Sequence, residues 1–199
     1  MNEVSLLPAA GHVEVAWRNG LGRSADIDRA PREGERFVWR LSIATIERAA
    51  AFSPYPGYDR SFAIIAGGGA AIEFRDGETM VSRGPRDILE FAGERRCIGR
   101  PLSGATRPLN VLTRRRAARH RLSTLALDPA GEEFTAAADV TLIVCLEGAI
   151  EAASPAGQWR LNSLDSLRIY GHYGMFELTP APDAEIALVE IDLAEDMPR

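Results

Sequence analysis

One short segment combines an arginine and a serine with large aromatic side chains at the spacing of a β-strand. Residues 37–44 read FVWRLSIA. Side chains alternate between the two faces of a strand, so Trp39 lies on an apolar face while Arg40 and Ser42 lie together on the other. If that polar face meets solvent, the pair has no function. If it lines the mouth of a barrel, the two side chains would donate hydrogen bonds to a carboxylate.

A second polar and aromatic segment follows at residues 52–60, FSPYPGYDR. Two prolines restrict its backbone, so this loop either forms the edge of a pocket or packs on a barrel. Ser53 is its polar candidate for ligand binding. Arg60 either pairs with the neighbouring Asp59 or faces a ligand.

Several kinds of catalytic site are excluded or disfavoured. All 23 basic residues are arginine, so a Schiff-base lysine and a phosphate-loop lysine are impossible. The three histidines, His12, His120 and His172, form no His-x-His or His-x-x-x-His pair, and no Gly-x-Ser-x-Gly elbow is present. We therefore expect no metal, no cofactor and no catalytic residue set.

The net charge and the cysteines indicate which partners and which cellular location to expect. The net charge is −5, and the basic run Arg114–Arg116 is too short for a nucleic-acid site, so we expect a solvated connector with acidic partners. We expect no nucleic-acid partner and no membrane association, since the apolar runs are short and no signal peptide is evident. A cytoplasmic location with two free buried thiols, Cys97 and Cys145, is the expectation.

Short apolar runs closed by Gly, Pro, Asp or Asn predict an all-β chain. Two segments, Thr45–Ala51 and Asp128–Ala138, are predicted to form short helical turns. We expect strands near residues 12–17, 37–46, 61–66, 70–74, 79–82, 87–91, 97–101, 109–114, 122–127, 141–146, 149–153, 159–161, 166–170, 174–178 and 186–193.

A weak internal repeat indicates duplication. The tripeptide at residues 71–73, Ala-Ile-Glu, recurs at 149–151, and Asp87 matches Asp165 at the same offset of 78 (149 − 71). Each half has the order of a cupin barrel, which it resembles: a hairpin with glycine in the turn, then an aspartate turn before a strand. The prediction is a bicupin, two RmlC-like jelly-roll β-barrels in one chain. Its first barrel, with an N-terminal segment, occupies residues 1–115, and its second occupies 116–199, with N-terminal strands shared between the barrels.

These motifs together resemble the HutD/Ves family. The matching blocks, in order, are 17–22 (WRNGLG), 37–44, 52–53, 56–60 (PGYDR) and 109–115 (LNVLTRR). Two positions depart from the family pattern: Leu21 replaces a glycine, and Pro108 replaces an aspartate. The resemblance implies a bicupin without a metal and a role beside histidine breakdown, with formylglutamate as a candidate ligand. It adds Asn19 and Asn110 to the site residues.

The leading hypothesis is therefore a small-molecule-binding protein that modulates histidine utilisation by binding an anionic carboxylate in the N-terminal barrel. The predicted ligand-binding residues are Asn19, Arg40, Ser42, Ser53, Arg60 and Asn110. The alternative is a metal-free cupin enzyme, such as an epimerase or isomerase, which needs a histidine base beside an acid. A structural partner protein with filled barrels is a third class. Pairing of sheet edges would produce a homodimer, and a monomer is equally open.

Overall fold

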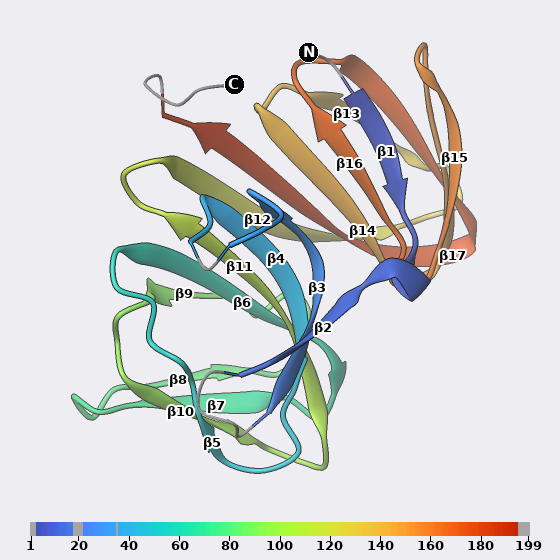
Figure 1. Cartoon of the computed structure of the whole chain (residues 1–199). Helices are drawn as coiled ribbons and strands as arrows, with labels where there is room; N and C mark the ends of the chain where they lie inside the picture. Colours follow the sequence, from blue (N-terminus) through green and yellow to red (C-terminus); the bar gives the residue numbers. More distant parts are fainter. Residues whose placement is uncertain (1–2, 18–21, 35, 195–199) are drawn as a thin grey trace. The chain divides into compact units, whose positions relative to one another are not determined.

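The computed structural model describes residues 3–17, 22–34 and 36–194, and within them the chain is almost entirely β (Figure 1). The one helical element of this part of the chain is the 3₁₀ turn η1 (Ala9–Gly11). The all-β fold predicted from the sequence is confirmed. None of the described helices is long and apolar enough to cross a membrane.

The chain divides into two compact units. Val13–Arg119 and Ala194 form the N-terminal unit. The C-terminal unit combines the described residues up to His12 with His120–Leu193. The C-terminal unit is therefore assembled from two stretches that are separated by the whole of the N-terminal unit.

The N-terminal unit contains two antiparallel sheets (Figure 1). The larger has the order β2 (Val13–Ala16), β3 (Arg23–Ala30), β4 (Trp39–Thr45), β11 (Thr106–Arg114), β6 (Tyr58–Gly67) and β9 (Leu89–Ala92). The smaller has the order β5 (Ala50–Ala51), β10 (Cys97–Pro101), β7 (Ala70–Phe74) and β8 (Thr79–Ser82). Both sheets contribute to one apolar cluster, which includes Phe62 and Ile64 from β6, Ile72 from β7 and Phe91 from β9.

The C-terminal unit is built on two long strands, β14 (Val140–Ser154) and β17 (Gly174–Leu193). Register shifts between Cys145 and Glu147, and between Gly148 and Ile150, divide their pairing into three parts. β15 (Gly157–Asn162) and β16 (Ser166–Tyr170) pair with β14, and β12 (Ala118–Leu127) and β13 (Glu132–Ala136) pair with β17. β1 (Glu3–Leu7) pairs with β16.

The pairing pattern supports the internal repeat. In the N-terminal unit β6 pairs with β11 and β9, and in the C-terminal unit β14 pairs with β17 and β16. Adding 78 to the bounds of β9 gives 167–170, which lies inside β16. Asp165 closes its turn as expected, because Oδ2 accepts a hydrogen bond from the Asn162 backbone N–H at 2.9 Å.

Both predicted helical turns are wrong. Within Thr45–Ala51, Ile46 forms a bridge with Thr106, and Ala50–Ala51 is strand β5. Within Asp128–Ala138, the Asp128 carboxylate caps a turn by accepting from the Ala130 N–H at 2.8 Å, and strand β13 then pairs with β17. In each case an available sheet edge satisfies the backbone better than an isolated helical turn does.

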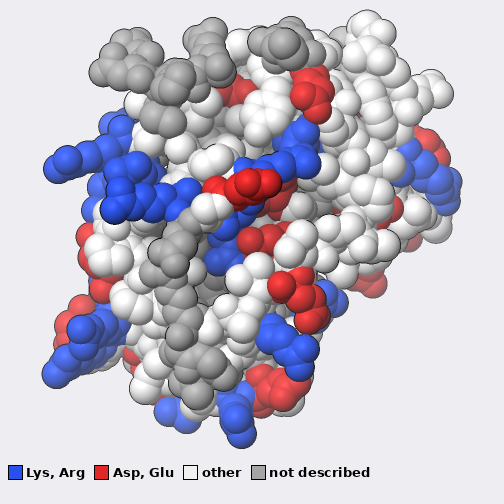
Figure 2. Space-filling model, in the orientation of Figure 1, with Lys and Arg blue, Asp and Glu red and all other residues white. Residues whose placement is uncertain are grey.

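The basic run at the end of β11 has acidic partners on the surface. The Arg115 guanidinium donates to Asp59 at 2.8 Å and to Glu94 at 3.1 Å. Figure 2 shows the same arrangement more widely, with arginine side chains interspersed among acidic ones on the face in view. Because Asp59 is engaged by Arg115, it does not neutralise Arg60.

Candidate functional site

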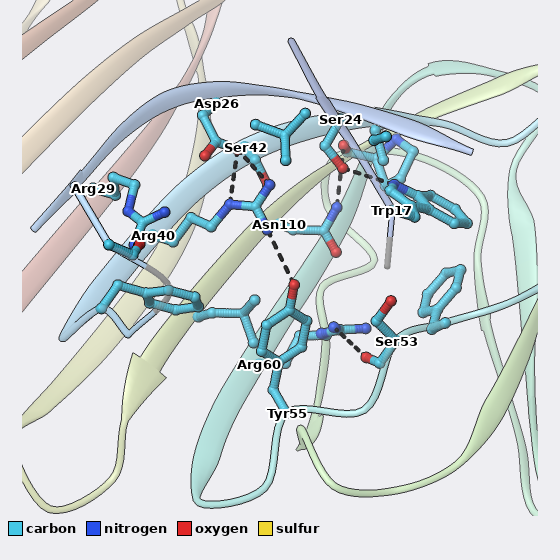
Figure 3. A pocket seen from close by; sticks show the side chains of 18 residues that line it. Trp17, Ser24, Asp26, Arg29, Arg40, Ser42, Ser53, Tyr55, Arg60 and Asn110 are labelled. Carbon is cyan, nitrogen blue, oxygen red and sulfur yellow. Dashed lines mark hydrogen bonds and ion pairs between the residues drawn. The ribbon is translucent and has the colours of Figure 1, made fainter. Parts of the chain in front are cut away.

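A pocket with a volume of about 290 Å³ lies in the N-terminal unit, on the face of the larger sheet that carries Phe62 and Phe91 (Figure 3). The described residues that line it come from β2, β3, β4, β6 and β11, from loop residues 52–55, and from the connecting residues Trp17, Gly34 and Phe37. Both polar segments singled out in the sequence therefore reach one cavity.

The alternation of the strands places the polar side chains in this pocket. Trp39 and Leu41 on β4 are buried away from it, whereas Arg40 and Ser42 line it. On β11, Asn110 lies opposite Ser42 and also lines the pocket. The polar face of residues 37–44 thus lines a pocket and does not face open solvent.

Three arginines occupy one row across the sheet. Arg29 on β3 lies opposite Arg40 on β4, Arg40 lies opposite Leu112 on β11, and Leu112 lies opposite Arg60 on β6. All four residues line the pocket. Like charges directly opposite each other on neighbouring strands destabilise a sheet, so this cationic row needs compensating negative charge.

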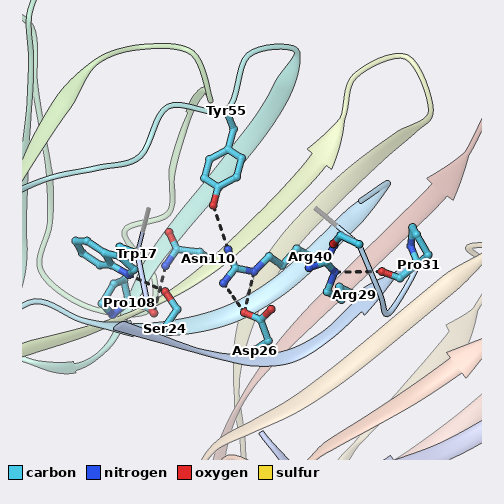
Figure 4. A network of polar contacts seen from close by, with 10 residues as sticks. Trp17, Ser24, Asp26, Arg29, Pro31, Arg40, Tyr55, Pro108 and Asn110 are labelled. Atoms are coloured by element: carbon cyan, nitrogen blue, oxygen red, sulfur yellow. Dashed lines mark hydrogen bonds and ion pairs between the residues drawn. The ribbon is translucent and has the colours of Figure 1, made fainter. Parts of the chain in front are cut away.

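Asp26 supplies part of that charge through a buried network (Figure 4). The Arg40 Nε donates to Asp26 Oδ1 at 2.7 Å, and Arg40 Nη2 donates to the same oxygen. The remaining arm of Arg40, Nη1, donates to the Tyr55 hydroxyl at 3.2 Å. Both residues are less than a tenth exposed, so this network holds Arg40 in a fixed direction.

No described residue supplies such a carboxylate to Arg60. Its side chain is buried, with the guanidinium 5.4–5.6 Å from the ring centres of Phe52, Tyr55 and Phe91. Nη2 donates to the Ser53 carbonyl at 3.3 Å, and Nε has no hydrogen-bond partner in the structure. Burial lowers the pKa of the Arg60 guanidinium from its usual value, and proximity to Arg40 adds to this effect.

Arg29 is held at the pocket by neutral groups. It donates to the carbonyls of Pro31 at 3.1 Å and Gly34 at 2.6 Å, and its guanidinium lies 5.2 Å from the centre of the Phe37 ring. Among the described residues that line the pocket, the charged ones are thus three arginines and Asp26. Their sum, 3 − 1, is two positive charges in a chain whose net charge is −5.

The opposite wall of the pocket is neutral and polar. The Trp17 indole N–H donates to Ser24 Oγ at 2.8 Å, and its ring packs edge-on against Phe52 at 5.8 Å. The Asn110 amide donates a long hydrogen bond to the Pro108 carbonyl at 3.5 Å. Pro108, one of the two departures from the family pattern, therefore contributes its carbonyl to this wall.

Five of the six predicted site residues, Arg40, Ser42, Ser53, Arg60 and Asn110, line this one pocket. Asn19 and Leu21 lie outside the described residues. The role of Asn19 in binding and the effect of Leu21 on the pocket stay predictions. Sequence reasoning missed Asp26 and Arg29, both on β3, a strand that it also missed. Residues 23–30 (RSADIDRA) do not show the pattern of a β-strand, because they are rich in Asp and Arg. A bulge between Asp26 and Asp28 also breaks the alternation of side chains between the two faces of the strand.

None of the three histidines is among the residues that line the pocket. His12 and His120 are half-buried elsewhere, and His172 is exposed. The enzyme alternative, which needs a histidine base in a barrel, gains no candidate from this pocket. Within the described ranges, no group of three or more His, Cys, Asp or Glu side chains is arranged to hold a metal ion.

The C-terminal unit carries different residues at the matching positions. At the repeat offset of 78, the positions that match Arg40, Ser42, Arg60 and Asn110 are occupied by Ala118, His120, Ala138 and Leu188. The core of this unit contains an apolar cluster: Phe134 stacks on Phe176 at 5.4 Å, and Trp159 and Tyr173 pack against the same ring.

The family model described as HutD matches residues 9–187. The chain belongs to the HutD family. One relative is an uncharacterised 21.2 kDa protein in the hutC 3′ region of Pseudomonas putida, 31% identical over 173 residues, which cover 86% of this chain and 90% of that protein. Protein Ves of Citrobacter koseri is 32% identical over 100 residues, 50% of this chain and 52% of that protein.

A solved structure gives the fold of the family. HutD from Pseudomonas fluorescens superimposes with a TM-score of 0.81 at 25% identity, covering 96% of this chain and all of that one. The resemblance to HutD and Ves and the bicupin fold, both predicted from the sequence, are confirmed.

Proposed function

We propose that this HutD-family protein binds a small anionic carboxylate in the pocket of the N-terminal unit and thereby modulates histidine utilisation. The observation that carries the proposal is Arg60, a buried guanidinium with an unpartnered Nε and no carboxylate bonded to it among the described residues. A buried charge is costly unless it is paired. A ligand carboxylate bound in the pocket would supply the missing partner of the Arg60 guanidinium.

The charge of the pocket favours a ligand with more than one negative group. The lining residues that the structure describes leave two positive charges uncompensated. Formylglutamate carries two carboxylates and is our leading candidate, whereas urocanate carries one. Each charge-assisted hydrogen bond in such a site contributes about 1.5–3 kcal/mol.

The link to histidine utilisation rests on relatives. The Pseudomonas putida relative is named for its place in the hutC 3′ region, and the solved Pseudomonas fluorescens protein is named HutD. The occupancy of a protein that binds a breakdown intermediate follows the concentration of that intermediate. Such a protein can therefore signal that histidine is being degraded.

The test is calorimetric titration of formylglutamate, glutamate and urocanate into the wild type, Arg40→Ala and Arg60→Ala. We expect formylglutamate to bind most tightly and each substitution to weaken it about tenfold or more. Arg115→Ala is the matched control, because it removes an arginine from the same unit but from a surface cluster outside the pocket lining.

Two results count against the proposal. If a carboxylate binds and neither pocket substitution weakens it more than the control does, the assignment of the site is wrong. If none of the three compounds binds the wild type, the carboxylate class is wrong, and an uncharged ligand or a metal-free reaction becomes the better hypothesis.

A further inference from the structure

Asp26 is unexpected in a pocket that is to receive an anion. It is 7% exposed and lines the same cavity as Arg40 and Arg60. A second carboxylate brought into this space is repelled by it. If the pocket needed only positive charge, a neutral acceptor would hold Arg40 in place and leave the site more cationic.

The geometry of the Asp26–Arg40 pair leaves one carboxylate oxygen unused. Arginine and carboxylate often pair through two parallel hydrogen bonds, one to each oxygen. Here Nε and Nη2 of Arg40 both donate to Oδ1. No described residue donates a hydrogen bond to Oδ2 of Asp26 in this arrangement. The side chain therefore orients Arg40 with one oxygen and keeps a charged acceptor for another donor.

Further acceptors lie in the same row of the sheet. Asp26 lies opposite Ser42, and Ser42 lies opposite Asn110, so these three side chains form an acceptor row beside the cationic row. The Asn110 amide nitrogen donates to the Pro108 carbonyl, which leaves its oxygen as an acceptor. At the backbone the two rows are two residues apart along β4, about 7 Å, and the Arg40 side chain crosses from one row to the other to reach Asp26.

Cationic donors beside a charged acceptor fit a particular pair of ligand groups. A carboxylate and an N–H on the adjacent carbon atom lie close together, so the carboxylate can accept from an arginine while the N–H donates to Asp26. A plain dicarboxylate has no donor for the acceptor row and would bring a second anion near Asp26. An amino acid or N-acylamino acid satisfies both rows at once.

We infer that the pocket selects a carboxylate that bears an N–H on the neighbouring carbon, with the cationic row holding the carboxylate and Asp26 Oδ2 accepting from the N–H. This inference rests on the proposed function and makes Asp26 a specificity-determining residue. It excludes simple organic acids from the preferred ligands.

The test uses two compounds that differ in one group. N-acetyl-L-glutamate has an N–H where O-acetyl-L-2-hydroxyglutarate has an ester oxygen, and both carry the same two carboxylates. We expect the wild type to bind the amide about tenfold or more tightly than the ester, because the ester oxygen sets an acceptor against an acceptor. Binding is measured by calorimetry.

Asp26→Asn reverses the chemistry with little change of shape. The amide oxygen still accepts from Arg40, while its NH₂ group replaces Oδ2 and is a donor. We expect this variant to bind the amide compound more weakly and the ester more tightly, so that the preference falls to about one or inverts. Asp28→Asn is the control: it is the same residue type on the same strand, also 7% exposed, and does not line the pocket.

The outcomes separate the two claims. Equal binding of amide and ester to the wild type, or a shift of both compounds in the same direction in Asp26→Asn, overturns the inference while the proposed carboxylate site stands. A shift in the same direction would mean that Asp26 only positions Arg40. If neither compound nor formylglutamate binds the wild type, the proposed function fails and the inference fails with it.

Discussion

Replacing Arg60 by methionine should make the ligand-free protein more stable and unable to bind its ligand. Arg60 is 6% exposed, its Nε is unpartnered, and no described carboxylate pairs with it. Methionine has a similar length and fills the space between the Phe52, Tyr55 and Phe91 rings without a charge. The substitution removes an uncompensated burial penalty of several kcal/mol.

Opposing contributions reduce the gain. The contacts of Arg60 with three rings are worth about 0.5–2 kcal/mol each, and its hydrogen bond to the Ser53 carbonyl about 1 kcal/mol. Methionine keeps the ring contacts through its sulfur. We therefore expect the free energy of unfolding to rise by about 1–3 kcal/mol, within the range found when buried charges are replaced by apolar groups.

The assay is thermal and denaturant unfolding with and without formylglutamate. Each kcal/mol should raise Tm by about 2–4 °C for a chain of this size. Saturating ligand should stabilise the wild type by about 2.7 kcal/mol at a hundred times Kd and leave Arg60→Met unchanged. A loss of more than 1 kcal/mol in the ligand-free variant would refute the reasoning, because Arg60 would then be a structural element.

Three further predictions concern the surroundings of the pocket. A Cβ at Gly99 would overlap the Phe52 ring, so Gly99→Ala should displace this wall of the pocket and weaken carboxylate binding more than it lowers Tm; unchanged affinity would contradict it. Burial raises the pKa of the Cys145 thiol to about 11, so native protein at pH 8 should react with a thiol reagent at Cys145 far more slowly than unfolded protein does, as mass spectrometry would show. Hydrogen bonds from Arg115 lower the pKa of the Glu94 carboxyl, so its stabilising effect is complete above the usual carboxyl pKa and is lost as pH falls through the lowered value. Arg115→Met should remove that part of the acid dependence of Tm, and an unchanged profile would count against it.

The sequence predicted the site better than it predicted the strand that completes it. Alternation in FVWRLSIA placed Arg40 and Ser42 on one face because β4 is a regular strand. Strand β3 was not predicted because Asp and Arg have low strand propensity, and because the Arg40 partner of Asp26 lies on another strand, of which local propensity contains no information.

The errors over helices have a related cause. Residues 128–138 contain a proline after an aspartate and many alanines, which favour a helix start. What decides the outcome is the edge of β17, where Phe134 pairs with Phe176 and stacks on its ring. A pairing between residues 42 positions apart cannot be predicted from the residues next to each of them in the sequence.

The discontinuous C-terminal unit has a consequence for the order of synthesis. Val13–Arg119 form a continuous stretch that emerges from the ribosome with nearly all of its own partners. Strand β1 has to wait for β16, since the Glu3–Arg168 pair joins groups that are 165 positions apart. Closing so long a loop is slow. Folding of the intervening N-terminal unit shortens the loop, so that unit has to fold before β1 pairs with β16. The domain with the pocket should therefore mature on the nascent chain, and docking of β1 on β16 should be among the last steps of folding.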